Sequence, residues 1–320
     1  MSVPSLQFYD HQPSVLSLRE EVLHGLARCP KSIPPKFFYD EQGSRLFDRI
    51  CEQPEYYPTR TEIALLKDNA EEIAELIGAD CTLIELGSGS NQKVRMLLNI
   101  IKPAAYVPID ISRDYLLQQA QAVAADYPWL RVFAACADFC QTLQLPQAAG
   151  GARKIAFFPG SSIGNFEPAE ALRLLRNIAR LVQGDGGLLV GADLKKAPGI
   201  LNAAYNDAQG ITAAFNLNLL RRINRELDGD FAVDRFSHQA YYNEQRGRVE
   251  MHLASRMEQT VQVAGERFHF APRETIHTEN SYKYDVEEFK ALVESAGFEL
   301  ARLWHDPQGR FGVFFFTHSG

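Results

Sequence analysis

The spacing of apolar residues along the middle of the chain predicts strands that alternate with helices. Short continuous apolar runs are typical of parallel strands, which are buried on both faces. Stretches in which apolar residues recur every three or four positions are typical of helices. This alternation predicts a doubly wound, Rossmann-like parallel α/β sheet. The predicted strands are 82–86, 105–109, 131–135, 154–158 and 188–192, and the predicted helices are 61–76, 91–101, 114–125 and 167–181.

The pattern changes after Lys195. A long helix and several alternating strands follow, which together predict an inserted α+β unit. The helix is 210–227, and the strands are 240–242, 249–255, 259–263 and 274–284. After the insertion the first pattern resumes with a helix at 286–296 and two final strands at 300–305 and 311–317.

A glycine turn follows the first predicted strand, in the string ELGSGS, and Asp110 ends the second strand. Ligands of open α/β sheets bind at the carboxyl ends of the strands, where an acid can accept hydrogen bonds from a ribose. A dinucleotide fingerprint would place a third glycine at position 92, which is Gln. Gly87 and Gly89 instead resemble the first motif of methyltransferases that use S-adenosylmethionine (SAM), a cofactor without phosphate.

Composition and charge restrict the possible functions. The 320 residues are 46% hydrophobic and 23% charged, which is typical of a globular protein with a large core. A net charge of −7 argues against nucleic acid or an anionic membrane as partner. No apolar run is long enough to span a membrane, and no secretory signal pattern begins the chain.

The five cysteines are scattered, and we predict reduced thiols in a cytoplasmic protein. Cys136 and Cys140 are four positions apart, but no second pair completes a zinc site, so we predict no metal. His252 and His277 form no evident catalytic dyad, and we predict structural roles for them.

Several separated strings resemble one family, the L-histidine Nα-methyltransferases of ergothioneine biosynthesis. These strings are PKFFYD, PEYYPTRTE, ELGSGS, FFPGSSIGN, AYNDAQGITAAFN, INRELDGDF, VEM and TENSYKY, and they extend from residue 30 to 284. The resemblance implies a SAM-binding methyltransferase domain at 61–196 and 287–320. It also implies a second, substrate-binding domain at 1–60 and 197–286, with histidine bound between the two. Nothing in the sequence requires a dimer, so we expect a monomer.

The resemblance assigns cofactor roles to six residues. Two glycines would line the methionine part of SAM, a lysine its carboxylate, and one aspartate its ribose. The adenine would contact a second aspartate through its exocyclic amine and a phenylalanine through its ring. The two glycines are Gly87 and Gly89, and the lysine is Lys93. The ribose aspartate is Asp110, and the adenine residues are Asp138 and Phe139.

The resemblance also assigns seven residues to the substrate. Asn165 would hold the α-amino group against the SAM methyl, and a neutral amide suits an amine that must lose its proton. Tyr39 and Tyr205 are implied at the α-carboxylate or amino end, with Tyr39 also a candidate acceptor of the ammonium proton. Tyr56 and Met251 are implied near the imidazole.

Glu279 and Ser281 would bind the two imidazole nitrogens. A strand at 274–284 would place Thr275, His277, Glu279 and Ser281 on one face, because side chains alternate along a strand. A carboxylate and a hydroxyl at this spacing can discriminate against substrates without ring nitrogens.

The resulting hypothesis is SAM-dependent trimethylation of L-histidine to hercynine. One alternative keeps the chemistry but acts on tryptophan or another aromatic amino acid, although a carboxylate at 279 matches an apolar ring poorly. A second is a nicotinamide-dependent oxidoreductase, which Gln92 opposes. A third is a non-catalytic module with a SAM-binding fold.

Overall fold

The computed structural model describes residues 6–11, 15–89, 91–139, 141 and 153–320, so that Ser90 and Cys140 lie outside the described residues. The chain forms two compact units. Unit 1 contains Met1–Gln12, Pro58–Lys195 and Lys283–Gly320, and unit 2 contains Pro13–Tyr57 and Lys196–Tyr282. Within the described ranges, no helix is both long enough and apolar enough to cross a membrane.

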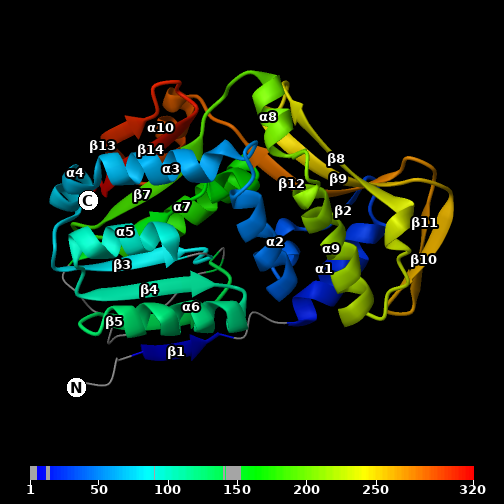
Figure 1. Cartoon of the computed structure of the whole chain (residues 1–320), viewed down its shortest axis with the longest axis horizontal. Coiled ribbons are helices and arrows are strands. Elements are labelled where there is room, and N and C mark those ends of the chain that lie inside the picture. Colours follow the sequence, from blue (N-terminus) through cyan, green and yellow to red (C-terminus); the bar gives the residue numbers. More distant parts are fainter. Residues whose placement is uncertain (1–5, 12–14, 90, 140, 142–152) are drawn as a thin grey trace. The chain divides into compact units, whose positions relative to one another are not determined.

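Unit 1 is built on one eight-stranded sheet with the order β1-β5-β4-β3-β6-β7-β14-β13 (Figure 1). Neighbours from β1 to β7 are parallel, whereas β14 is antiparallel to β7 and to β13. The chain order reverses at β3, and this reversal is where open α/β sheets bind ligands. The strands are β1 (Leu6–Asp10), β3 (Cys81–Leu86), β4 (Ala105–Asp110), β5 (Arg131–Cys136), β6 (Arg153–Phe158), β7 (Gly187–Asp193), β13 (Phe298–His305) and β14 (Phe311–His318).

Helices cover both faces of this sheet. α3 (Tyr57–Asp68), α4 (Ala70–Ile77), α5 (Gln92–Ile101) and α6 (Arg113–Asp126) contribute to one apolar core. α7 (Pro168–Val182) and α10 (Val286–Glu294) contribute to the other. All six residues of β3 are buried, which explains why its sequence is a continuous apolar run. The apolar stripe predicted for α5 is buried as expected.

Two features of unit 1 differ from the expectations. Leu6–Asp10 pairs in parallel with β5, so the first strand belongs to the large sheet, and assigning all of 1–60 to the substrate domain was wrong. The helix expected over 61–76 is two helices, because Asn69 interrupts it. The side-chain amide of Asn69 donates to the carbonyl of Leu65 (2.8 Å), which is the local competition with helix geometry that Asn favours.

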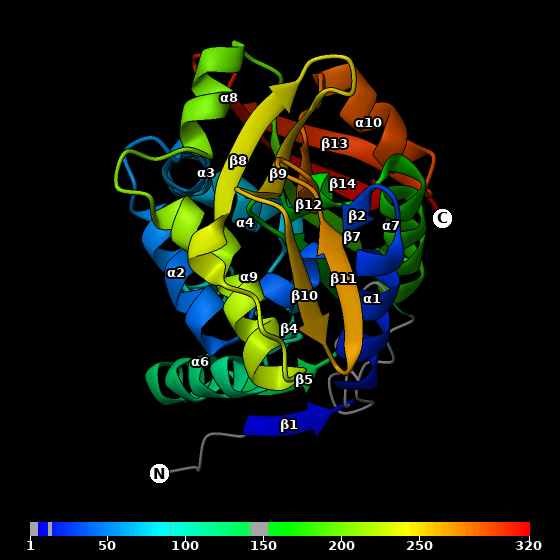
Figure 2. The same cartoon turned by 90° about the vertical axis from the view of Figure 1, so that its right-hand side faces the viewer.

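Unit 2 is an α+β unit around a four-stranded sheet with the order β2-β12-β9-β8 (Figure 2). Its strands are β2 (Lys31–Ser32), β8 (Phe236–Asn243), β9 (Arg248–Ser255) and β12 (Thr275–Tyr282), and β10 (Gln259–Val263) with β11 (Glu266–Phe270) forms a separate hairpin. Its helices are α1 (Val15–Ala27), the 3₁₀ helix η1 (Pro35–Phe38), α2 (Glu41–Cys51), α8 (Pro198–Ala204), α9 (Ile211–Glu226) and the 3₁₀ helix η4 (Val233–Arg235).

The two faces of this sheet differ in chemistry because side chains alternate along β9. The inner face carries Val249, Met251 and Leu253, which belong to the apolar core of unit 2. The outer face carries Arg248, Glu250 and His252. α9 packs against β8 and β9, and Asn216 of this helix donates to the carbonyl of His252 (3.1 Å).

Candidate functional site

The glycine turn after β3 is held against the end of β4. The backbone N–H groups of Gly87 and Ser88 both donate to the carbonyl of Ile109, at 2.9 and 3.1 Å. Gly87 has a φ of +72°, which favours glycine, whereas Gly89 has no such constraint. A Cβ atom at Gly89 would meet nothing within 4 Å. The turn therefore leaves open space beside Gly89, as a cofactor-binding turn requires.

Phe139 brings a third strand end to this turn. Its ring lies 3.8 Å from the position that a Cβ of Gly87 would occupy. The ring packs edge-on against Phe158 at the end of β6, with a centroid separation of 5.7 Å. Asp138 precedes it and accepts a backbone hydrogen bond from Gln141 (3.0 Å) on its carbonyl. The predicted cofactor residues of β3, β4 and β5 therefore end at the same edge of the sheet.

Asp110 ends β4, where its Oδ1 accepts from the backbone N–H of Ser112 (2.8 Å). Burial raises the pKa of this carboxyl to about 6, although backbone hydrogen bonds from Ser112 and Ile111 oppose the shift. The carboxylate form predominates only above this pKa. A ligand that donates hydrogen bonds would stabilise this form further.

Glu85 is a second buried acid, at the end of β3. The hydroxyl of Tyr106 donates to its Oε2, and Ser88 Oγ lies 3.2 Å from the same hydroxyl. Burial raises the pKa of Glu85 to about 7, although hydrogen bonds from Tyr106 and Ser88 oppose the shift. The sequence analysis gave this residue no role.

We expect Glu85→Gln to be more stable to unfolding than the parent, by an amount that increases as the pH rises from 4.5 to 7. The ordinary pKa of a glutamate is 4.5, so between pH 4.5 and 7 the folded protein binds more protons at Glu85 than the unfolded chain does. The stability of the parent therefore falls through this window, and the variant lacks this loss. Thermal unfolding midpoints from pH 5 to 8 measure the difference. The exposed Glu71→Gln serves as control, and a gap between Glu85→Gln and parent that does not change with pH would contradict the prediction.

Lys93 is paired with an acid that the sequence analysis missed. Its Nζ lies 2.6 Å from Oε2 of Glu62, and the Glu62 side chain is only 1% exposed. Both oxygens of Glu62 also accept from the backbone N–H of Gly160, at 3.0 and 2.9 Å. A Cβ atom at Gly191 would lie 2.2 Å from Glu62 Oε1, so only glycine leaves room there.

Glu62 therefore joins α3, α5 and the loop after β6 through one buried carboxylate. Its only signal in the sequence was its place in the string PEYYPTRTE. The partner of a helix acid cannot be read from such a string, because Gly160 is 98 positions away.

Asn165 ends the 3₁₀ helix η3 (Ser162–Asn165), which follows β6. Hydrogen bonds hold the loop before it, since Ser162 donates to the carbonyl of Pro159 (3.0 Å) and Ser161 Oγ accepts from the N–H of Asp193 (2.9 Å). Asp193 in turn pairs with Lys283 at 2.8 Å, and both side chains are 1% exposed. The carboxyl ends of β6 and β7 are thereby linked beside Asn165.

In unit 2, the three predicted tyrosines lie along one chain of aromatic contacts. Tyr39 packs edge-on against Phe47 (5.8 Å between centroids), Phe47 against Tyr56 (6.3 Å) and Tyr56 against Tyr205 (6.2 Å). Burial raises the pKa of Tyr56 well above its ordinary value, and the ionisable groups of Tyr205, Cys51, Tyr39 and Glu279 nearby would raise it further when they are ionised. Tyr56 is therefore a neutral phenol at physiological pH.

Ser281 joins this group through Tyr205, whose hydroxyl donates to Ser281 Oγ (2.7 Å). Met251, Glu279 and Ser281 are 2%, 8% and 4% exposed. Six of the seven predicted substrate residues therefore belong to unit 2, and Asn165 belongs to unit 1.

A β-bulge determines which residues of β12 share a face, and here the alternation predicted from the sequence was wrong. The register with β9 shifts after His277, so that His277 faces His252 whereas Glu279 faces Met251. Thr278 is the extra residue, and its hydroxyl contacts Asn216 Oδ1 (2.9 Å) and the carbonyl of Met251 (3.1 Å).

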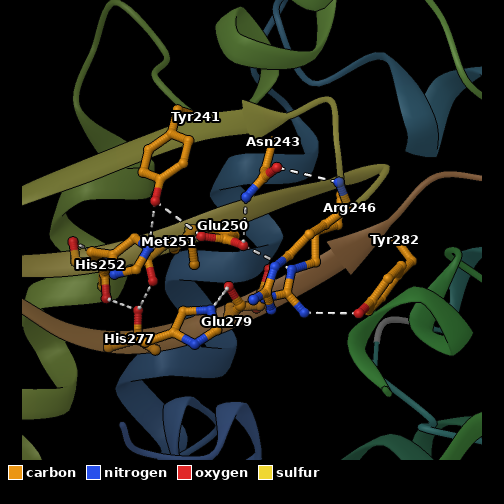
Figure 3. A network of polar contacts seen from close by, with 12 residues as sticks. Tyr241, Asn243, Arg246, Glu250, Met251, His252, His277, Glu279 and Tyr282 are labelled. Carbon is orange, nitrogen blue, oxygen red and sulfur yellow. Dashed lines mark hydrogen bonds and ion pairs between the residues drawn. The ribbon is translucent and has the colours of Figure 1, made fainter. Parts of the chain in front are cut away.

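Glu279 and Ser281 consequently lie with Met251 on the inner face. His277, Asn280 and Tyr282 lie on the outer face, opposite His252, Glu250 and Arg248. Figure 3 labels His277, Tyr282, His252 and Glu250 of this set. Thr275 and His277 therefore do not share the face of Glu279. Strict alternation failed because the bulge adds one residue to β12 and reverses the side-chain directions beyond it.

The parallel sheet with helices on both faces and the glycine turn after β3 give unit 1 a Rossmann-like fold. The model of the family "Histidine-specific methyltransferase, SAM-dependent" matches residues 18–318. The chain belongs to this family and is an N-methyltransferase. This membership overturns the alternatives of a nicotinamide-dependent oxidoreductase and a non-catalytic module.

Curated relatives agree with the family. The chain is 43% identical to the histidine N-alpha-methyltransferase of Mycolicibacterium smegmatis, over 93% of this chain and 94% of that protein. It is 40% identical to the protein of the same name from Mycobacterium tuberculosis, with the same coverage. It is also 32% identical to the ergothioneine biosynthesis protein 1 of Neurospora crassa, over 86% of this chain and 32% of that longer protein.

Proposed function

We propose that this protein transfers three methyl groups in turn from SAM to the α-amino nitrogen of L-histidine, giving hercynine for ergothioneine biosynthesis. The observation that carries the proposal is the placement of Glu279 and Ser281 on the inner face of β12, beside Met251. The names of the relatives and the description of the family support the same substrate.

This pair suits a neutral imidazole, which has one N–H group and one nitrogen with a lone pair. The carboxylate of Glu279 would accept from the N–H. Ser281 Oγ accepts from the hydroxyl of Tyr205 (2.7 Å), and the Ser281 hydroxyl would donate to the other nitrogen when the ligand binds. Met251 and Tyr56 would pack against the ring.

The cofactor residues would divide SAM among them. Asp110 would accept from the ribose hydroxyls, Asp138 from the adenine amine, and Phe139 would contact the adenine ring. Gly87 and Gly89 would line the methionine portion, and the space beside Gly89 is open. Lys93 would face its carboxylate, while Glu62 keeps the ammonium of Lys93 in position (2.6 Å).

Each transfer requires a free lone pair on the α-amine. SAM supplies an activated methyl group; the nitrogen attacks the methyl carbon in line, the C–S bond breaks and S-adenosylhomocysteine leaves. The amine must lose a proton before each transfer, and the third transfer leaves a quaternary ammonium. Asn165 would hold the amine without retaining this proton, which an ion-paired carboxylate would do. Tyr39 would lie at the same end of the substrate, and alignment would provide most of the rate acceleration.

We expect Asp110→Asn to weaken SAM binding by about tenfold or more, because hydrogen bonds to a charged acceptor contribute about 1.5–3 kcal/mol. Binding to the parent should weaken as the pH falls below about 6, where Asp110 takes up a proton. Binding to the variant should not depend on pH in this range. Calorimetric titrations with SAM at pH 5 to 8 measure both effects. The control is Asp114→Asn, whose side chain is 86% exposed, and a pH-independent affinity in the parent would contradict the prediction.

Mass spectrometry of the protein incubated with SAM and the twenty amino acids tests the substrate. We expect histidine alone to gain three methyl groups. Methylation of another amino acid instead would show that the roles of Glu279 and Ser281 are wrong while the cofactor residues stand. The runner-up substrate, tryptophan or another aromatic amino acid, would leave the buried carboxylate of Glu279 facing an apolar ring.

A further inference from the structure

A cluster of metal-ligand side chains lies on the outer face of the unit 2 sheet. It consists of Glu250, His252 and His277, and we call it the outer-face cluster (Figure 3). Glu250 and His252 are two positions apart on β9, and His252 faces His277 across the strand pair. One ligand atom of each residue lies within 4.8 Å of the others.

The spacing between Glu250 and His252 matches that of two metal ligands. Oε2 of Glu250 lies 3.4 Å from Nε2 of His252. Two ligands at about 2.0–2.1 Å from a tetrahedral Zn²⁺ are separated by roughly 3.3–3.4 Å. The rings of His252 and His277 are stacked with centroids 4.8 Å apart. The ring of His277 is also oriented by its Nε2, which donates to the carbonyl of Glu279 (3.1 Å).

The three side chains are in the protonation states that metal ions require. Burial lowers the pKa of both histidines, so their imidazoles are neutral at physiological pH and keep a lone pair. Burial opposes ionisation of Glu250, but hydrogen bonds from Arg248 and Tyr241 outweigh it and lower its pKa to about 2. Glu250 is therefore a carboxylate although its side chain is only 8% exposed.

Hydrogen bonds alone do not satisfy His252. Its Nδ1 is buried and has no hydrogen-bond partner among the residues that the structure describes. Within the described part of the chain, its Nε2 contacts the hydroxyl of Tyr241 at 3.3 Å and Oε2 of Glu250 at 3.4 Å, and both distances are long for hydrogen bonds. A buried imidazole held this weakly in an otherwise connected polar network requires an explanation.

We propose that the outer-face cluster binds a divalent transition-metal ion of the Zn²⁺ class through Glu250, His252 and His277. Two imidazoles and one carboxylate form a donor set that suits zinc, whereas Mg²⁺ and Ca²⁺ prefer oxygen ligands alone. Water or the hydroxyl of Tyr241 would complete the coordination. Tyr241 is 44% exposed, so the ion can enter by displacing its side chain.

Arg248 limits the affinity without blocking the site. Its Nε donates to Oε1 of Glu250 (2.8 Å), whereas Oε2 accepts from the hydroxyl of Tyr241 (2.9 Å), a hydrogen bond that the ion would replace. Its positive charge repels a cation, so we expect weaker binding than in structural zinc sites. The ion would also lie across the sheet from Met251, Glu279 and Ser281, and its binding is therefore distinct from the proposed binding of histidine. The cysteine-based expectation of no metal site did not consider these residues together.

Competition with a chromophoric chelator tests the site in full-length, metal-free protein without an affinity tag and without histidine, which itself binds zinc. We expect one equivalent of Zn²⁺. Glu250→Gln, His252→Gln and His277→Gln should each weaken binding by at least about tenfold. The matched control is His269→Gln on β11, where His269 (57% exposed) lies 3.8 Å from Glu258 and has no third ligand nearby among the described residues; its affinity should not change.

Spectroscopy of the metal bound to the unsubstituted protein tests the same proposal without relying on the folding of any variant. Co²⁺ at the outer-face cluster should show the intense visible absorption of a low-coordinate ion, and zinc X-ray absorption should show imidazole scattering. Zinc binding that survives all three substitutions, or a weak six-coordinate cobalt spectrum, would overturn the proposal.

Discussion

Asn165→Ala is expected to reduce methyl transfer to histidine by at least about 100-fold, because a misplaced amine loses alignment with the methyl carbon. The loss should fall on kcat. SAM binding should be unchanged, since the cofactor residues lie on β3, β4 and β5 and the segments directly after them. Single-turnover assays and calorimetric titration with SAM separate the two effects.

A second asparagine of unit 1 provides the control for this substitution. Asn177 lies on α7, where its Oδ1 accepts from Arg180 (3.1 Å) at the surface. Asn177→Ala should leave both turnover and SAM binding unchanged. If Asn165→Ala turns over at the parental rate, the assignment of the amine to this residue is wrong.

Glu279→Ala is expected to lower kcat/KM for histidine by about 100-fold or more. Truncating one partner of a buried, charged hydrogen bond costs about 2–5 kcal/mol, and Glu279 is 8% exposed. The loss should appear mainly in KM, because the ring contact exists both before and during methyl transfer. Steady-state kinetics with histidine, and with amino acids that lack ring nitrogens, measure the affinity and the discrimination together.

Glu258→Gln is the matched control, because it changes a carboxylate of the same unit that is 74% exposed. It should leave kcat/KM unchanged. An unaltered KM for histidine in Glu279→Ala would exclude a direct contact between this carboxylate and the imidazole.

The local pattern of apolar and polar residues was sufficient to predict a helix or strand wherever that element depends on its immediate neighbours. The continuous apolar runs correctly predicted the buried strands β3 to β7, since a strand covered on both faces has few polar positions. The apolar stripe of α5 and the glycine turn before it were also predicted, because both depend on residues within one or two helical turns. Leu6–Asp10 was missed in the sequence analysis. None of its residues is fully buried, and it is a strand because it pairs with β5.

The same distinction applies to the candidate sites. The strings of the chain predicted roles for the glycine turn, Asp110, Phe139 and the substrate residues of unit 2 through their resemblance to one family, and these roles stay predictions. Only the tertiary structure placed Glu62 against Lys93 and Gly160, since hydrogen bonds between distant segments leave no periodic signal. Only the tertiary structure also revealed the bulge at Thr278, which turns Glu279 toward Met251 and leaves His277 beside His252. A bulge depends on the pairing of two strands, and one strand read alone cannot predict it.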